Sequence, residues 1–217
     1  MGKQKVADII DSGFAEIKPE SGFYVWWFPQ EAANKLIEPL NEFIDDDRLE
    51  KIQVELFDGQ PYYALYFGIA SKKGGLLQRI KWHTAAINPH TAACVRHRTL
   101  STLRQTICGL MGWPMVGQNT QKLVDDIIRE CYWEWSEHDN PHDIEKEQLN
   151  NVNACYPLNI MGNNTISKER RKKLEICEFY LVSSNYAIDQ SVQIVLNNIP
   201  EGDIRDVWQM VGRVHED

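Results

Sequence analysis

The sequence predicts an α+β fold in which a small, mainly antiparallel sheet is flanked by helices. Runs of β-branched and aromatic residues at 23–28, 51–57 and 62–69 have the length and composition of strands. Longer segments place apolar residues every three or four positions, which is typical of amphipathic helices. At 217 residues, the chain has room for one main domain with small appendages.

The N-terminal elements are predicted in chain order. Residues 6–17 are amphipathic, so we expect residues 1–20 to form a helical extension and the main domain to span 21–165. The buried aromatic strand 23–28 ends at Pro29. A helical pattern then covers 31–44 and is closed by the acidic run 45–47 in a solvated turn, so we expect an insertion at about residues 30–50.

The middle of the chain begins with a hairpin. The runs 51–57 and 62–69 are separated by Asp58-Gly59-Gln60-Pro61, a turn sequence. Four helices are predicted after it: about 76–86, about 101–111 with Thr99 or Ser101 as N-cap, near 121–129, and one begun by Asn140-Pro141. The charged residues 166–217 are predicted to form a helical C-terminal extension.

Composition indicates a globular protein that stays in the cytoplasm and binds no membrane. Hydrophobic residues make up 43% of the chain, yet no run approaches the roughly 18 apolar residues of a membrane helix, and the opening residues lack a secretory signal. The five cysteines are scattered and never form a C-x-x-C pair. We therefore expect reduced thiols, and neither a disulfide framework nor a zinc site.

The charge of the chain is unevenly distributed. The net charge is −8, but residues 59–124 contain no Asp or Glu and carry +8, so the remainder carries −16. The basic residues of this acid-free window are Lys72, Lys73, Arg79, Lys81, Arg96, Arg98, Arg104 and Lys122. Such segregation is what a phosphate-binding face requires, although a solvated surface could cluster charge in the same way.

Two glycine-bearing tyrosine triplets and one helical pair stand out. The triplets, Gly22-Phe23-Tyr24 and Tyr66-Phe67-Gly68, lie on predicted strands, and Arg79 and His83 are four apart on the following helix. On a helical wheel, Arg79 and His83 share the edge of the apolar stripe. An arginine beside a strand-borne tyrosine can clamp a phosphate. Each residue alone could equally be a core tyrosine or part of an exposed helix face.

The order GFY, YFG, R-x-x-x-H, glutamate, asparagine resembles the GIY-YIG nuclease superfamily over roughly residues 22–159. The resemblance implies a metal-dependent DNA endonuclease with Tyr24, Tyr66, Arg79, His83 and one glutamate as its catalytic residues. It also implies Mg²⁺ or another divalent cation held by the glutamate. About forty residues separate the tyrosines, and this insertion resembles the restriction-enzyme branch.

Two glutamates compete for the metal position. On a wheel of the predicted helix, Glu145 shares an azimuth with Leu149 and Val152, whereas Glu147 points about 200° away. A carboxylate on an apolar stripe is costly unless it is paired or bound to metal. We therefore expect Glu145 to be the ligand, with Glu147 in reserve.

The resemblance extends to supporting residues and to the substrate. Asn159, in Tyr156-Pro157-Leu158-Asn159, matches the asparagine that supports the site, although it could be a plain turn residue. We expect backbone contacts to DNA from Lys72, Lys73, Lys81, Arg96, Arg98 and Arg104, and from the basic run 167–173. Cutting both strands with one active site per chain favours a homodimer.

Two alternatives remain open at this stage. One is a catalytically inactive protein that binds nucleic acid and keeps the nuclease fold. The other is an acidic interaction protein whose aromatic motifs are only core residues, in which case affinity for duplex DNA would be negligible and insensitive to salt.

Overall fold

The computed structural model describes residues 1–42, 44–71, 73–86, 101–111, 113 and 118–159, and it has the predicted α+β architecture. A five-stranded antiparallel sheet has the order β1-β5-β2-β4-β3. The strands are β1 (Gly2–Lys5), β2 (Gly22–Pro29), β3 (Val54–Phe57), β4 (Gln60–Ala70) and β5 (Tyr132–Glu137). The helices are α1 (Val6–Asp11), α2 (Gln30–Ile37), the 3₁₀ turn η1 (Glu38–Glu42), α3 (Asp46–Leu49), α4 (Gly75–His83), α5 (Thr102–Leu110), α6 (Gln118–Glu130) and α7 (Pro141–Asn150).

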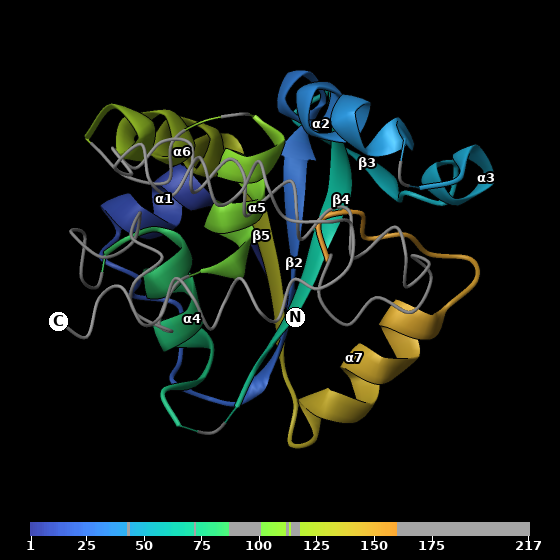
Figure 1. Cartoon of the computed structure of the whole chain (residues 1–217). Helices are drawn as coiled ribbons and strands as arrows, with labels where there is room; N and C mark the ends of the chain where they lie inside the picture. The colour runs from blue at the N-terminus through green and yellow to red at the C-terminus, as the bar shows by residue number, and fades with distance from the viewer. Residues whose placement is uncertain (43, 72, 87–100, 112, 114–117, 160–217) are drawn as a thin grey trace, which may run out of the picture.

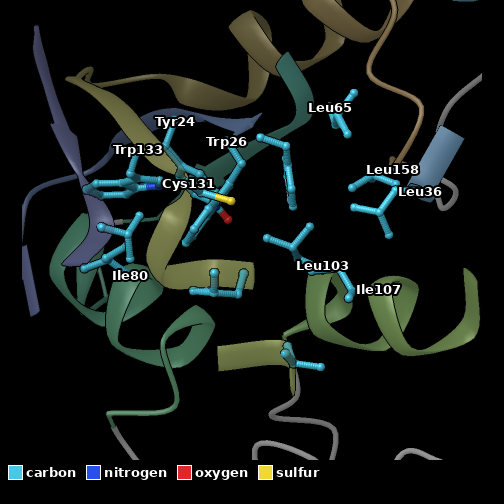
Figure 2. Close-up of a cluster of buried hydrophobic side chains, with 14 of the residues drawn as sticks. Tyr24, Trp26, Leu36, Leu65, Ile80, Leu103, Ile107, Cys131, Trp133 and Leu158 are labelled. Atoms are coloured by element: carbon cyan, nitrogen blue, oxygen red, sulfur yellow. The ribbon is translucent and has the colours of Figure 1, made fainter. Parts of the chain in front are cut away.

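Helices cover both faces of the sheet, and each face has its own core. Helices α1, α4, α5 and α6 lie on one side of β2, and α7 lies on the other (Figure 1). Alternate residues of β2 supply the two cores: Tyr24, Trp26 and Phe28 face the larger cluster, while Val25 and Trp27 face the smaller one. Figure 2 shows Tyr24 and Trp26 beside Trp133 in the larger cluster.

The sheet is strongly curled. Lys3 on β1 and Glu55 on β3 lie on the two opposite edge strands, yet Lys3 Nζ donates to Glu55 Oε2 at 2.7 Å. Four strand spacings of about 4.8 Å would separate these edges by roughly 19 Å in a flat sheet, which two side chains cannot bridge. Lys3 also pairs with the buried Glu134 at 2.9 Å and lies over the ring of Trp27.

Two strands were not predicted. β1 has the polar sequence GKQK, and it is a strand because its backbone pairs with β5 from Gly2 opposite Trp135 to Lys5 opposite Tyr132. No strand was predicted between the helix near 121–129 and the helix begun by Asn140-Pro141, and β5 lies there in the chain and between β1 and β2 in the sheet. Its charged Glu134 is buried because it accepts from Trp27 Nε1 and pairs with Lys3, and this partnership is not visible locally.

The predicted helix over 31–44 is shorter and broken. α2 ends at Ile37 and continues as the 3₁₀ turn η1 because Pro39 has no amide hydrogen and disfavours helical geometry at the residue before it. The acidic run was predicted to be a turn, but Asp46 begins the short helix α3. Carboxylates in a first turn are stabilised by the partial positive charge of a helix N-terminus.

The hairpin is confirmed and is tighter than the sequence suggested. β3 ends at Phe57 and β4 begins at Gln60, so the turn consists of Asp58 and Gly59 alone. Both have positive φ, 51° and 76°, as the two central residues of a type I′ turn require. Asp58 also accepts a 2.6 Å hydrogen bond from the Tyr132 hydroxyl.

Several expectations fall outside the described residues, among them the C-terminal extension 166–217, the basic run 167–173, and Lys72, Arg96 and Arg98. Within the described part of the chain, no helix is long and apolar enough to cross a membrane. Cys108, Cys131 and Cys155 are buried and free.

Candidate active site

Antiparallel pairing brings the two motif tyrosines to the same face of the sheet, because Tyr66 lies opposite Trp26 and Trp26 is two residues after Tyr24. A β-bulge follows directly beyond this pair. Trp26 lies opposite Tyr66 and Trp27 lies opposite Ala64, so Leu65 is an extra residue on β4. An extra residue reverses the side-chain alternation beyond it. Leu65 and Tyr66 consequently both face the larger core, and the Tyr66 ring stacks on Tyr24 with centroids 6.4 Å apart.

The glycines of both triplets are required by close approach. Gly68 lies opposite Tyr24, and a Cβ atom there would be 2.4 Å from the Tyr24 ring and hydroxyl. A Cβ on Gly22 would be 2.1 Å from the Ser136 carbonyl oxygen on β5. Gly68 therefore leaves space for the Tyr24 ring, and Gly22 leaves space for the β5 backbone.

His83, at the end of α4, is enclosed by aromatic rings. Its imidazole is 2% exposed and lies against Tyr24, Trp26 and Tyr66, with centroids 5.4, 5.4 and 5.9 Å away. Both ring nitrogens are bonded: Nε2 to the Tyr24 hydroxyl at 2.8 Å, and Nδ1 to Ser101 Oγ at 2.6 Å. Burial, together with the charges of Arg79 and Arg104, lowers the pKa of His83 to about 3. The imidazole is therefore neutral at pH 7.

Tyr24 is equally enclosed, at 2% exposure. Burial raises its pKa well above the usual value, the Tyr66 hydroxyl and the Glu145 carboxylate act in the same direction, and the Arg79 charge opposes them. A phenol in this position is neutral at pH 7. Tyr66 is the more accessible of the two motif tyrosines.

Arg79 is the cation of the site. It lies on α4 one turn before His83, is half-buried, and places its guanidinium 5.1 Å from the centre of the Trp82 ring. With the other described residues it forms no ion pair or side-chain hydrogen bond. No described residue accepts a hydrogen bond from its guanidinium, so these planar N–H donors can bind a ligand that has several oxygens.

The two competing glutamates on α7 differ in exposure. Glu145 is half-buried and Glu147 is exposed, as the wheel indicated, although Val152 belongs to no stripe because α7 ends at Asn150 and Val152 is 70% exposed. Burial raises the pKa of the Glu145 carboxyl, and the charges of His142 and Arg79 oppose that shift. Glu145 forms no ion pair with another described residue.

Asn159 holds the second motif strand in place. Its Oδ1 accepts from the Phe67 amide at 2.8 Å, and its Nδ2 donates to the Phe67 carbonyl at 2.6 Å. The Leu158 amide also donates to the Leu65 carbonyl at 2.9 Å. β3 pairs with β4 only up to Tyr63, so this segment satisfies the β4 backbone edge where the bulge lies and where β3 has ended.

One residue predicted to contact DNA is buried, and that prediction was wrong. The Arg104 side chain is 3% exposed, pairs with Asp125 Oδ1 at 2.7 Å, and donates to the His83 carbonyl at 3.1 Å. Its charge is used inside the fold and cannot reach a phosphate in solution. By contrast, Lys73 is exposed, and Lys81 is partly exposed with Nζ 5.4 Å from the Phe14 ring centre.

Two contacts to the site were missed by the sequence analysis. Ser101 was considered only as an N-cap, and it has that role, accepting from the Arg104 amide at 3.2 Å, but its hydroxyl also binds His83. Trp82 was not considered. Its position three residues after Arg79 was the available signal, because such residues are neighbours on a helix.

The site can supply one carboxylate to a divalent cation. Among the described residues, no group of three or more His, Cys, Asp or Glu side chains could hold a metal. A single half-buried carboxylate fits Mg²⁺, which usually keeps several waters and binds through one or two carboxylates plus substrate phosphate oxygens. Glu145 therefore has the chemistry that such an ion requires.

The arrangement can be compared with known proteins. The family model described as the GIY-YIG catalytic domain matches residues 22–178. No curated protein and no solved structure matches the chain. The matched span covers both tyrosine triplets, α4, α7 and Asn159. Because it also covers more than half of the chain, this protein belongs to the GIY-YIG family, whose catalytic domain indicates a nuclease-type function.

Proposed function

We propose that this protein is an endonuclease that hydrolyses phosphodiester bonds of DNA with the help of Mg²⁺ or another divalent cation. The observation that carries the proposal is electrostatic. The charge of Arg79 acts on Tyr24, His83 and Glu145 together, although the four residues come from β2, α4 and α7. Helices α4 and α7 lie on opposite sides of β2 (Figure 1), so the charge of Arg79 links residues that come from both sides of the sheet.

Each residue has a role that follows from its surroundings. Arg79 steadies the scissile phosphate, since its planar donors match phosphate oxygens and stabilise charge that develops on them. Tyr66, the more accessible tyrosine, orients the phosphate or the attacking water. Tyr24 assists in deprotonating that water, and the enclosed His83 acts through Tyr24.

Glu145 would hold the cation. When bound, a divalent cation neutralises charge on the phosphate and lowers the pKa of water. Positive charge near Glu145 also favours the ionised form of Tyr24, whose pKa the Glu145 carboxylate by itself raises. Asn159 contributes indirectly, because it fixes the backbone beside Tyr66.

The DNA-facing surface is proposed to include Lys73, which precedes α4, and Lys81, which lies in the last turn of α4. Lys72, Arg96 and Arg98 are proposed to belong to it as well. A restriction-type role remains a prediction, based on the α2–α3 insertion between the motif strands. A homodimer and a cytoplasmic location also remain predictions.

The test is cleavage of supercoiled plasmid by the full chain, with Mg²⁺ and with EDTA. Arg79→Ala and Glu145→Gln should abolish nicking. Glu147→Gln is the matched control, because it neutralises an exposed carboxylate two residues further along the same helix. If Glu147→Gln abolished nicking and Glu145→Gln did not, the assignment of the ligand would be wrong.

Two further outcomes would overturn the proposal itself. Salt-sensitive binding of duplex DNA without any cleavage would identify an inactive nucleic-acid-binding protein that keeps the nuclease fold. Equal nicking by wild type and by the Arg79 and Glu145 variants would show that the activity comes from elsewhere.

A further inference from the structure

A chain of hydrogen bonds leads away from the site to the start of α5. The Arg104 amide donates to Ser101 Oγ at 3.2 Å, Ser101 Oγ binds His83 Nδ1 at 2.6 Å, and His83 Nε2 binds the Tyr24 hydroxyl at 2.8 Å. All four residues are buried. The proposed function uses Tyr24 and His83 but leaves open the direction in which these bonds are donated.

A neutral imidazole donates from one nitrogen and accepts at the other, so only two arrangements exist. In the first, Nδ1–H donates to Ser101 and the Tyr24 hydroxyl donates to Nε2. In the second, the Ser101 hydroxyl donates to Nδ1 and Nε2–H donates to the Tyr24 oxygen. The first makes His83 an acceptor for the Tyr24 proton, and the second makes it a donor to the Tyr24 oxygen.

Hydrogen-bond satisfaction favours the second arrangement. Ser101 Oγ already accepts from the Arg104 amide. If it also accepted from Nδ1–H, its own hydrogen would have no acceptor among the described residues, and a buried donor without a partner is costly. If it donates to Nδ1 instead, the Ser101 hydroxyl accepts one hydrogen bond, from the Arg104 amide, and donates one, to His83.

The electrostatics at Ser101 agree. Ser101 is the N-cap of the nine-residue helix α5, whose N-terminus carries partial positive charge. This partial charge favours an unprotonated Nδ1 toward α5 and places the ring proton on Nε2.

The Tyr24 end is consistent with this direction. In the second arrangement the Tyr24 hydrogen needs an acceptor other than His83, and the Tyr66 hydroxyl, which is hydrogen-bonded to Tyr24, can take that role. In that case the Tyr24 proton points toward Tyr66 and leaves the Tyr24 oxygen free to accept from His83.

We propose that Ser101 is a positioning residue that holds His83 as its Nε2–H tautomer, so that His83 donates a hydrogen bond to the Tyr24 oxygen. His83 then stabilises negative charge on that oxygen and does not serve as a base that removes the Tyr24 proton. The catalytic consequence rests on the proposed nuclease function. The proton arrangement itself does not.

The direct test is ¹⁵N NMR of the histidine-labelled full chain, in which the two ring nitrogens of each tautomer have distinct shifts. His83→Gln identifies the His83 signals. We expect the Nε2–H form in wild type and in Ser101→Thr, which keeps the hydroxyl. Ser101→Ala should give a mixture of tautomers. Thr84→Val is the matched control, because it removes a hydroxyl that bonds only backbone carbonyls of α4.

Two results would overturn the proposal: an Nδ1–H tautomer in wild type, or a tautomer that Ser101→Ala leaves unchanged. The NMR readout also separates this inference from loss of the N-cap, which lowers the melting temperature without changing a tautomer. In the plasmid assay, Ser101→Ala should lower kcat about ten- to a hundredfold with little change in the Kd for DNA. If the tautomer were as expected and wild type cut no DNA, the proposed function would fail and the positioning role would stand.

Discussion

Acidification should lower the free energy of unfolding, because His83 is buried as a neutral imidazole. The His83 pKa is about 3 in the folded chain, against about 6.5 when it is unfolded. Below about pH 6.5 the His83 imidazole binds a proton in the unfolded chain but not in the folded chain, so the free energy of unfolding falls as the pH falls. The stability associated with the neutral, buried His83 is fully present above about pH 6.5, and it is lost progressively as the pH falls toward about 3.

The magnitude follows from linkage. Each pH unit in this range corresponds to about 1.36 kcal/mol, so lowering the pH from about 7.5 to about 5 should remove about 2 kcal/mol through His83 alone. Such a loss is a large fraction of the 5–15 kcal/mol that is typical of folded domains.

Urea unfolding at several pH values would measure this loss for wild type and His83→Gln. The variant is expected to be less stable at neutral pH, because it loses aromatic packing, but its stability should fall less between about pH 7.5 and about pH 5. The difference between the two slopes removes the contributions of carboxyl groups and of the other histidines. Thr84→Val, which leaves the imidazole in place, should keep the wild-type slope. Parallel curves for wild type and His83→Gln would refute the burial of a neutral imidazole.

Three further predictions concern the residues around the tyrosines. Gly68→Ala places a Cβ atom 2.4 Å from the Tyr24 ring, so it should cost about 1–3 kcal/mol in thermal unfolding and lower nicking activity; unchanged stability and activity would contradict the close approach. Asn159→Ala leaves the Phe67 amide and carbonyl without their partners and should cost about 2–4 kcal/mol in thermal unfolding. Asn159→Asp keeps the acceptor but sets a carboxylate oxygen against the Phe67 carbonyl, so it should be no more stable than Asn159→Ala at neutral pH; a near-wild-type stability of either variant would contradict this pair of hydrogen bonds. Trp82→Leu removes the ring that lies against the Arg79 guanidinium and should weaken DNA binding by about 0.5–1 kcal/mol. Trp82→Phe should restore part of that affinity. Equal Kd values for the two variants would argue against this contact.

The order of the elements could be predicted from the sequence because local patterns encode it. The period of apolar residues marked the β2 and β4 strands and the four later helices, and Asp58-Gly59 fixed the hairpin turn through its positive φ angles. The motif glycines and tyrosines lie in triplets that can be recognised without coordinates. The wheel of α7 also separated the half-buried Glu145 from the exposed Glu147.

Strands β1 and β5 could not be predicted in this way. β1 has no apolar signal, and it exists because the β5 backbone lies beside it. Glu134 interrupts β5 with a charge whose burial depends on Lys3 and Trp27, and both are more than a hundred residues away in the chain. Such long-range pairs leave no periodicity in either segment.

The sequence alone therefore determined which side chains were available, and the tertiary structure decided what each of them touches. The bulge at Leu65 turns two consecutive residues, Leu65 and Tyr66, to the larger core, and no local propensity signals that extra residue. Arg104 looks like any other cation of the acid-free window, but Asp125 and the His83 carbonyl bury it. The physical reason is that burial and hydrogen bonding depend on partners brought by distant elements, whereas charge and periodicity belong to the segment itself.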